Sequence, residues 1–344
     1  MAKKTYLIAI AVIAVLLVAS AGSLLYFQGA TNSSPSPNPS ATPTSSATSS
    51  PSPSPSSSPL VLPVTVTDDE GNNLTITSFP QRIVTLAPSN TQILFAIGAG
   101  DKVVGVTQYD NNPYNFSAWF EAGNMTCIGG FSTPNKEIIV SLQPDLILAT
   151  PINDVDIATL RSLGYKVLVL NPASVNGVLN DITMIGKAIG QESNANTLVA
   201  SLTTQLNTIS AKIAAANVTD KPKVYYEVYA GDQLMTIGST CWISDVIAKA
   251  GGVNIFANET EQWPYVSAET VVQKNPDVIL VSASMGTDSY NVTTVTSRDG
   301  WGNTNAVKNN RIVLMDGDLF QEAGSRIADQ VAAAAKALYP DLFN

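Results

Sequence analysis

The sequence predicts an α/β protein of two lobes, each with a central, mostly parallel sheet flanked by helices, joined by a single long interlobe helix. Residues 137–148 (EIIVSLQPDLIL) and 269–280 (ETVVQKNPDVIL) share Glu, Val, Pro-Asp and Ile-Leu in register, which indicates a duplicated unit. Each copy is typical of a short helix, a proline that ends it and an apolar strand. The strands are apolar almost throughout, as in a parallel sheet covered on both faces. The proline-free stretch 173–216 supplies the connecting helix.

Residues 1–29 predict a secretory signal or membrane anchor. Two lysines precede an apolar run, and residues 5–27 are long enough to span a bilayer. Ala19-Ser20-Ala21 resembles a cleavage site, so cleaved secretion is the alternative. No cysteine lies near this run, which excludes a lipid-modified N-terminus. Residues 30–60 are rich in Ser, Pro and Thr and predict an extended linker. A linker favours an uncleaved signal anchor on the outer face of the cytoplasmic membrane.

Composition excludes several classes of function. The net charge of -9 and the pI near 4.5 provide no basic patch for nucleic acid. The chain has no histidine, the commonest metal ligand and general base, so neither a bare-metal receptor nor a Ser-His hydrolase is expected. No glycine-rich phosphate motif occurs. The sequence therefore predicts a binding protein rather than an enzyme, with no metal site, no catalytic residue and no covalently required cofactor.

Sequons and cysteines also bear on location. N-x-S/T sequons are typical of secreted chains, although a chain rich in Asn and Thr also forms them by accident. They begin at Asn32, Asn73, Asn115, Asn124, Asn217, Asn258 and Asn291. Cys127 and Cys241 fall in different predicted lobes, so a disulfide between them would restrain the cleft; free thiols are the expectation.

The first lobe is predicted at residues 61–172. Alternating residues 64–79 around an acidic Gly-Asn turn predict a hairpin. Pro88-Ser89-Asn90 is typical of a helix start, and Gly98 of a helix end. The remaining elements alternate as a parallel sheet requires: strand 83–86, helix 91–97, strand 103–106, the first repeat unit, helix 157–163 and strand 166–170.

The connector is predicted at residues 173–217, with an interruption at 190–194. Its second part carries an apolar face at helical spacing, formed by Leu198, Leu202, Leu206, Ile209 and Ile213. The second lobe, residues 218–344, alternates again. Its predicted elements are strand 224–229, helix 242–250, strand 253–256, the second repeat unit, strand 312–315 and helix 327–338.

Five segments resemble a known family. They are RIVTLAPSNTQILFAIGAGDKVVGV from Arg82, NKEIIVSLQPDLIL from Asn135, VSAETVVQKNPDVIL from Val266, WGNTNAVKNNRIVLMDGDLF from Trp301 and SRIADQV from Ser325. Over residues 62–343 the chain is similar to class III substrate-binding proteins of ABC importers for cobalamin, haem and ferric siderophores. The resemblance implies two lobes joined by one rigid helix, a small-molecule metal chelate as ligand, an ABC permease with its ATPase as partner, and a monomer.

The resemblance also implies a docking role for two glutamates. In such proteins the glutamate that begins each repeat helix contacts arginines of the permease, and by position these are Glu137 and Glu269. Two carboxylates on equivalent surfaces of the two lobes suit a symmetric partner. Exposed ion pairs add little affinity, but they orient the partners and raise the rate of encounter. Alternatively, each glutamate only favours the positive end of its helix. Both roles are compatible.

The ligand site is expected between the lobes, where the carboxyl ends of parallel strands leave a crevice. Candidate wall residues are Ser89, Asn90, Tyr109 and Phe131 in the first lobe, and Tyr229, Trp242, Trp263, Tyr265, Asp318 and Phe320 in the second. Aromatic side chains can stack on a macrocycle, whereas an anionic siderophore calls for arginines. None of the five arginines is expected at the cleft, which favours a neutral or amide-decorated chelate.

Within the family, the chain is most like the cobalamin-binding members. The segments GDLF and SRI carry this likeness, and Asp318 matches a residue that contacts the corrinoid. Leu319 and Gln321-Glu322 depart from the pattern, where tryptophan and arginine are common. The sequence predicts a tethered extracytoplasmic receptor for a corrinoid or related chelate. The alternatives are a ferric siderophore or haem receptor, a surface adhesion protein on its Ser/Pro stalk, and a metallocluster enzyme subunit, which needs more cysteines.

Overall fold

The computed structural model describes residues 61–343 except 112, 115, 232 and 284–291. The predicted anchor and linker, and the sequons at Asn32, Asn115 and Asn291, lie outside the described residues. In the part that is described, no helix is long and apolar enough to cross a membrane.

The first lobe is built on a five-stranded parallel sheet with strand order β5-β4-β3-β6-β7. The strands are β3 (Ile83–Thr85), β4 (Val103–Val106), β5 (Thr126–Cys127), β6 (Leu146–Ala149) and β7 (Val167–Val169). The helices are α2 (Pro88–Ala96), α3 (Ser117–Glu121), α4 (Lys136–Ser141) and α5 (Asp154–Ser162), with 3-10 turns at Gly100–Lys102 and Pro151–Asn153. The predicted hairpin is confirmed, since β1 (Val64–Thr67) and β2 (Asn73–Ile76) pair antiparallel.

The second lobe repeats this plan around a four-stranded parallel sheet, β11-β8-β13-β14. The strands are β8 (Lys223–Glu227), β11 (Val253–Asn254), β13 (Val278–Ser282) and β14 (Ile312–Met315). The helices are α8 (Trp242–Lys249), α9 (Ala268–Lys274), α10 (Val292–Thr296), α11 (Asn305–Lys308), α12 (Gly317–Phe320) and α13 (Ile327–Leu338), with a 3-10 turn at Trp301–Asn303. A small antiparallel sheet was not predicted: β9 (Tyr229–Ala230), β10 (Leu234–Met235) and β12 (Tyr265–Val266).

The repeat helices begin and end in the same way. Asn135 caps α4 by accepting a hydrogen bond from the Ile138 backbone N–H at 3.0 Å. Ser267 caps α9 by accepting from the Thr270 N–H at 3.1 Å. Just past each helix, Gln143 and Asn275 take left-handed backbone angles, with φ of 48° and 47°. The two copies therefore share the position of the N-cap and that of the left-handed residue after the helix, as well as their sequence identity.

The repeated aspartates fasten neighbouring strands. Asp145 Oδ2 accepts from the backbone N–H of Arg82 at 3.0 Å, at the start of β3. Asp277 Oδ2 accepts from the N–H of Lys223 at 2.9 Å, at the start of β8. Each carboxylate thus satisfies a donor at the end of the adjacent parallel strand, which explains why both copies carry Asp after the proline.

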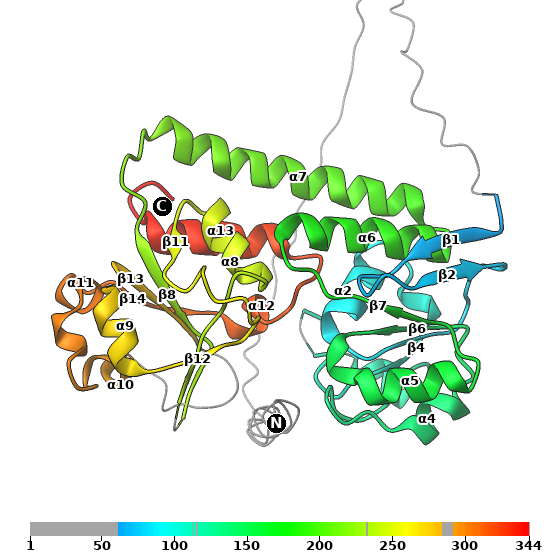
Figure 1. The fold of residues 1–344 in the computed structure, drawn as a ribbon. Coiled ribbons are helices and arrows are strands. Elements are labelled where there is room, and N and C mark those ends of the chain that lie inside the picture. Colours follow the sequence, from blue (N-terminus) through cyan, green and yellow to red (C-terminus); the bar gives the residue numbers. More distant parts are fainter. Residues whose placement is uncertain (1–60, 112, 115, 232, 284–291, 344) are drawn as a thin grey trace, which may run out of the picture.

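Two helices form the connector. α6 (Val175–Ile189) ends at Gly190, whose φ is 75°, and α7 (Glu192–Ala215) follows in the opposite direction, so the predicted interruption is confirmed. Helix α7 runs from the first lobe to the second and packs on both α6 and α13 (Figure 1). Its length is about 36 Å at 1.5 Å per residue. The predicted domain boundaries stay predictions.

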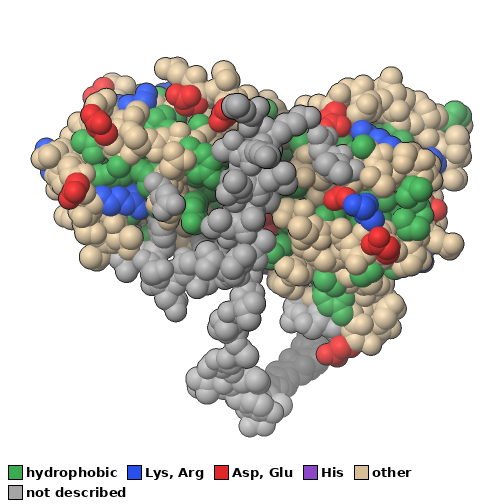
Figure 2. Space-filling view, turned by 60° about the horizontal axis from the view of Figure 1, so that its bottom comes forward, with side chains coloured by type: hydrophobic (Ala, Val, Ile, Leu, Met, Phe, Trp, Pro, Cys, Tyr) green, Lys and Arg blue, Asp and Glu red, His purple; other side chains and the backbone are tan. Residues whose placement is uncertain are grey.

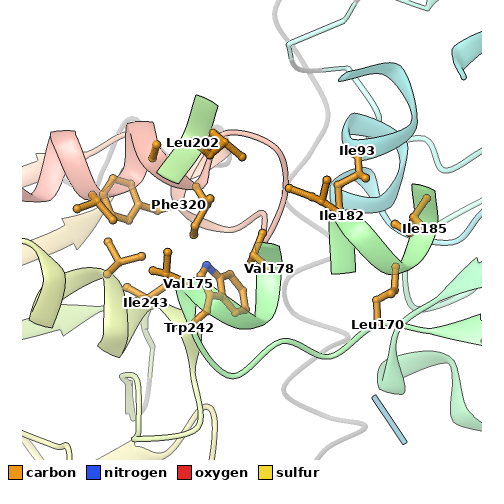
Figure 3. Close-up of a cluster of buried hydrophobic side chains, with 14 of the residues drawn as sticks. Ile93, Leu170, Val175, Val178, Ile182, Ile185, Leu202, Trp242, Ile243 and Phe320 are labelled. Carbon is orange, nitrogen blue, oxygen red and sulfur yellow. The ribbon is translucent and has the colours of Figure 1, made fainter. Parts of the chain in front are cut away.

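A single apolar core continues beneath α7 from one lobe to the other. Helix α6 lies at its centre (Figure 3). Ile182 and Ile185 face Ile93 and Leu170 of the first lobe. At the other end of α6, Val175 and Val178 face a group from the second lobe that includes Trp242, Ile243 and Phe320. The lobes are therefore joined by packed side chains as well as by the chain itself.

The two cysteines are free thiols. Cys127 is exposed on the edge strand β5, and Cys241 is buried before α8. A disulfide between the lobes is therefore absent from the described structure, which leaves the seam between them without a covalent restraint.

Candidate functional site

The carboxyl ends of both sheets meet at the seam between the lobes. Helix α2 follows β3 in the first lobe, and α12 follows β14 in the second. The two lobes are distinguishable as rounded bodies on either side of this seam (Figure 2). Gln92 Nε2 of α2 donates to Glu322 Oε2, which lies between α12 and α13. The seam is the expected position of a ligand in an open α/β protein.

A polar cluster surrounds this interlobe contact. Arg326 Nη2 donates to Glu322 Oε2 at 3.3 Å and to the Asp318 carbonyl at 2.9 Å. Burial raises the pKa of Glu322 to about 8, against the lowering effect of Arg326, while Asp110 and Asp318 raise it further. Burial also raises the pKa of Asp110 to about 6, although Thr107 donates to its carboxylate. The junction therefore holds two carboxyl groups whose pKa values are raised, so that their protonated forms are favoured.

Three polar atoms of this cluster have no hydrogen-bond partner among the described residues. They are Asn90 Nδ2, Asp110 Oδ1 and Arg326 Nε, and all are buried. A buried polar atom without a partner is costly, so natural proteins seldom keep one without a role. The expectation that no arginine lies at the cleft is wrong for Arg326: it lies at the junction because the start of α13 faces α2.

The second lobe presents an aromatic wall. Met235 of β10 pairs with Tyr229 of β9 on one side and with Tyr265 of β12 on the other. Paired residues point to the same face of a sheet, so the three side chains form one row. The alternate row, which includes Leu234, packs against the core of the second lobe. The tyrosine row therefore faces away from that core, just beyond the carboxyl end of β8, and Tyr265 is 37% exposed.

Trp263 extends this wall and is anchored from behind. Its ring makes an edge contact with Trp242, with centroids 5.5 Å apart. Trp242 Nε1 in turn donates to Gln330 Oε1 at 3.2 Å. Trp263 is half-buried, whereas Trp242 is only 7% exposed and belongs to the core that joins the lobes. Trp242 thus supports the wall rather than forming its surface.

Two candidates of the second lobe differ sharply in exposure. Phe320 is fully buried and packs against Tyr226 at a centroid distance of 5.9 Å, so it faces the core instead of the cleft. The reason is its position on the inner side of the short helix α12. Asp318, two residues earlier, is exposed on the same helix.

The first-lobe candidates lie on one helix and two loops at the carboxyl edge of its sheet. Ser89 and Asn90 are on the first turn of α2, Tyr109 follows β4 and Phe131 follows β5. Asn90 is buried, whereas Ser89, Tyr109 and Phe131 are half-buried. The Phe131 carbonyl accepts from Asn153 Nδ2 at 2.8 Å, which fixes that loop to the end of β6. The edge is therefore braced by neighbouring loops.

Sequence reasoning missed a second aromatic group beside the junction. Phe95 of α2 packs on Tyr114 and Phe116, with ring centroids 4.9 Å and 5.0 Å away, and on Trp119 at 5.5 Å. Tyr114 is half-buried, and burial raises its pKa while the positive charge of Arg326 acts to lower it. The density of aromatic residues in 114–120 (YNFSAWF) is the signal that could have identified this group.

All five arginines have partners within the described protein. Arg161 pairs with Asp68 at 2.9 Å and Arg298 with Glu227 at 2.5 Å. Arg82 donates to the Leu142 carbonyl, Arg311 to the carbonyls of Ala337 and Leu338, and Arg326 to Glu322 and Asp318. A forked guanidinium placed to receive a ligand carboxylate is therefore not found among the described residues.

The docking candidates and two surface pockets lie away from the cleft walls. Glu137 and Glu269 are exposed in the first turns of α4 and α9. Glu269 Oε1 accepts from Gln273 Nε2 at 3.0 Å. Two pockets of about 300 and 270 Å³ flank the C-terminal end of α7, far from the seam. Their linings share Val218 and hold no cluster of ligand-type side chains, so we assign no function to them.

Comparison with known proteins gives a consistent family. The family model described as "Periplasmic binding protein" matches residues 83–319. The chain is 35% identical over 288 residues to the uncharacterized ABC transporter substrate-binding lipoprotein YvrC of Bacillus subtilis, covering 82% of this chain and 88% of that protein. It is 30% identical over 284 residues to a cobalamin-binding protein of Halobacterium salinarum, covering 80% and 74%.

A solved structure agrees with these matches. A possible iron-binding (periplasmic solute-binding) protein from Staphylococcus epidermidis aligns with a TM-score of 0.65 at 27% identity, over 76% of this chain and all of that one. The two parallel-sheet lobes and the helix between them thus have a counterpart in an experimental structure. The chain belongs to the periplasmic binding protein family, among the substrate-binding proteins of ABC transporters.

Proposed function

We propose that this protein captures a corrinoid or closely related metal chelate in the cleft between its lobes and delivers it to an ABC permease and its ATPase. The tyrosine row of Tyr229, Met235 and Tyr265 is the observation that carries the proposal. Tyr265 is exposed, Tyr229 is half-buried and Met235 is buried between them, so the row offers aromatic surface at the carboxyl edge of the sheet, which suits a large, flat ligand. The function needs no bond-making and no resident cofactor.

The ligand class follows from the charges. Every arginine is engaged inside the protein, so the carboxylates of an anionic siderophore lack a bidentate partner. A chelate whose periphery carries neutral amides needs hydrogen bonds and stacking instead. The cobalamin-binding relative from Halobacterium salinarum supports this choice. The iron-binding Staphylococcus epidermidis structure supports a ferric chelate as the second candidate.

We further propose that the molecule works outside the cytoplasm, tethered by residues 1–29 and spaced from the membrane by residues 30–60. The apolar run and the Ser/Pro-rich segment support a tether. The Bacillus subtilis relative is named a lipoprotein, which supports a tethered location of some kind. This chain has no cysteine near its apolar run, which favours a signal anchor.

The ligand is tested with the full chain in detergent micelles, by equilibrium dialysis against cobalamin, haem and a panel of ferric siderophores. We expect cobalamin to be retained. Tyr265→Ala should weaken binding by about tenfold, because one aromatic stacking contact contributes about 1.5 kcal/mol at most beyond its buried area. Tyr265→Phe keeps the ring and should bind nearly as the unaltered protein does. Retention of a siderophore alone would select the second candidate, and retention of no chelate would overturn the proposal.

A further inference from the structure

One contact between the lobes joins uncharged hydrogen-bonding groups of the first lobe to a carboxyl group of the second. Gln92 of α2 donates to Glu322, and Ser325 Oγ lies 3.5 Å from the Gln92 carbonyl. Gly324 is so close that a Cβ built there would be 3.2 Å from the Ser89 carbonyl oxygen. The loop between α12 and α13 therefore sits directly on the first turn of α2.

The charged groups that act on Glu322 come from three elements. Burial raises the pKa of Glu322 most, Arg326 at the start of α13 lowers it, and Asp110 after β4 and Asp318 on α12 raise it further. Arg326 is in turn faced by Tyr114. One guanidinium thus acts on three carboxyl groups, of which Asp110 and Glu322 are largely shielded from water and Asp318 is exposed. It can compensate one negative charge, and full ionisation of the cluster is unfavourable while the lobes touch.

We propose that Glu322 is a positioning residue whose protonation holds the two lobes together: protonated Glu322 keeps the contact with Gln92 and narrows the cleft, and ionised Glu322 releases the lobes and weakens ligand binding. The part that concerns the ligand rests on the proposed function. The part that concerns the lobes does not, and it can be measured without any ligand.

The direction of the pH effect follows from where the proton is held. With the lobes in contact, burial raises the pKa of Glu322 to about 8, whereas solvation on opening returns the pKa toward the ordinary glutamate value of 4.5. Between these two pKa values Glu322 is protonated in the closed arrangement and ionised in the open one. Low pH therefore favours the closed arrangement, and rising pH favours the open one. One such proton changes the closing equilibrium by up to about tenfold per pH unit. The chain has no histidine that would titrate in this range, but Asp110, whose pKa burial raises to about 6, titrates at its acid end.

A hydrogen-bonded path leads from Glu322 to the aromatic wall. Gln330 Nε2 donates to the Glu322 carbonyl at 2.6 Å, and Gln330 Oε1 accepts from Trp242 Nε1. Trp242 makes the edge contact with Trp263 described above. A shift of the loop that carries Glu322 would thereby move Trp242, which supports Trp263. Protonation of Glu322 can in this way change the affinity for the ligand.

The test begins with the unliganded full chain. One dye is placed on the exposed Cys127 and its energy-transfer partner on Val253→Cys, a site that is 45% exposed on the outer strand of the second lobe. Cys241 is buried and its raised pKa keeps it unreactive. Transfer efficiency should fall between pH 6 and pH 8 in the unaltered protein. Glu322→Gln, which is permanently neutral, should keep high transfer throughout.

Two further variants separate a proton switch from a merely structural role. Glu322→Ala removes the contact and should give low transfer at every pH. Gln92→Glu places a second carboxyl at the contact and should move the opening midpoint to lower pH. Glu259→Gln changes an exposed carboxyl of the second lobe and should follow the unaltered profile. An unchanged pH profile in Glu322→Gln, with folding confirmed by thermal unfolding, would overturn the inference.

The ligand measurement then tests the consequence. The dissociation constant of the chelate retained in dialysis should rise by about tenfold or more from pH 6 to pH 8, as one released proton requires. In Glu322→Gln the same change of pH should alter it by less than about twofold. Equal slopes in both proteins would refute the coupling to affinity. If no chelate binds at any pH, the proposed function is wrong. The energy-transfer experiment still tests whether protonation of Glu322 holds the lobes together, because it uses no ligand.

Discussion

Asp181 shows how one buried carboxyl can set the stability of the whole fold. It lies on α6 and is 1% exposed. Burial, followed by the nearby charge of Asp69, raises its pKa to about 9. Its Oδ1 has no hydrogen-bond partner among the described residues. At neutral pH Asp181 is therefore held protonated in the folded protein, although the same group ionises freely in the unfolded chain.

We predict that Asp181→Asn raises the free energy of unfolding by about 2 kcal/mol or more at pH 8. In the unaltered protein the pKa of Asp181 is higher in the folded state than in the unfolded state. Its contribution to stability is therefore fully present below about pH 4 and is lost as the pH rises toward 9, by up to about 1.4 kcal/mol per pH unit. Urea unfolding at pH 5, 7 and 8.5 measures the effect, which should grow with pH. Asp220→Asn, at an exposed position, should leave the curve unchanged. A gain independent of pH would contradict the assignment.

The site residues illustrate what single positions do and do not reveal. Tyr229, Trp263 and Tyr265 were predicted at the cleft. Strand pairing brings Tyr229 and Tyr265 onto one face of a small sheet, and the contact of all three with a ligand stays a prediction. Trp242 and Phe320 come from the same predicted set but are buried, because their placement in the fold depends on which face of a short helix meets the core. A sequence shows that an aromatic residue follows a strand. It does not show the direction of its side chain when α12 spans only four residues.

Gly190 makes the turn between α6 and α7. Its φ is 75°, a conformation that side chains with a Cβ adopt at a cost, and a Cβ there would come within 2.9 Å of the Phe79 ring. The glycine therefore satisfies two demands at once. It ends α6 in the left-handed conformation, and it lets the hairpin of α6 and α7 approach the first lobe.

We predict that Gly190→Ala lowers the free energy of unfolding by about 2–3 kcal/mol, of which about 1 kcal/mol is conformational and the rest is steric. Gly164→Ala is the matched comparison, because Gly164 has a φ of 89° after α5 but no atom lies within 4 Å of its added Cβ. It should lose only the conformational part, about 1 kcal/mol. Equal losses in the two variants, measured by denaturant unfolding, would show that the Phe79 contact has no effect.

Elements with a strong local pattern were predictable, and those that depend on distant partners were not. The duplicated units were found because capping residues, a proline and an apolar strand all lie within a dozen positions. The sheet of β9, β10 and β12 was missed because each strand has only two residues, too few to show an alternation of apolar and polar side chains. The contact of Gln92 with Glu322 joins residues 230 positions apart, and nothing local marks either one.

At the scale of the molecule, two equivalent glutamates face outward from the two lobes. Glu137 and Glu269 lie in the first turns of α4 and α9, both on the lower side of Figure 1, away from α7. We propose that they orient the protein on its permease. Exposed charges of this kind add less than about 1 kcal/mol each in isolation, so their contribution is to encounter and alignment.

We predict that the double variant Glu137→Lys with Glu269→Lys abolishes uptake of labelled chelate by host cells and leaves the dissociation constant unchanged within about twofold. The charge reversal repels the cationic surface expected on the permease, and the sites are remote from the cleft wall. Glu121→Lys with Glu259→Lys reverses two other exposed charges, one per lobe, and should sustain uptake. Loss of chelate affinity in the first pair would contradict a docking role.

The path of the backbone through α7 has a consequence for biosynthesis. In the described chain, everything before α7 belongs to the first lobe or leans on it, and everything after α7 belongs to the second. A nascent polypeptide leaving the translocation channel can therefore complete its leading half early. Until α8 forms, however, the apolar side chains of Val175 and Val178 on α6 stay exposed to solvent, which makes this face of α6 prone to aggregation during folding.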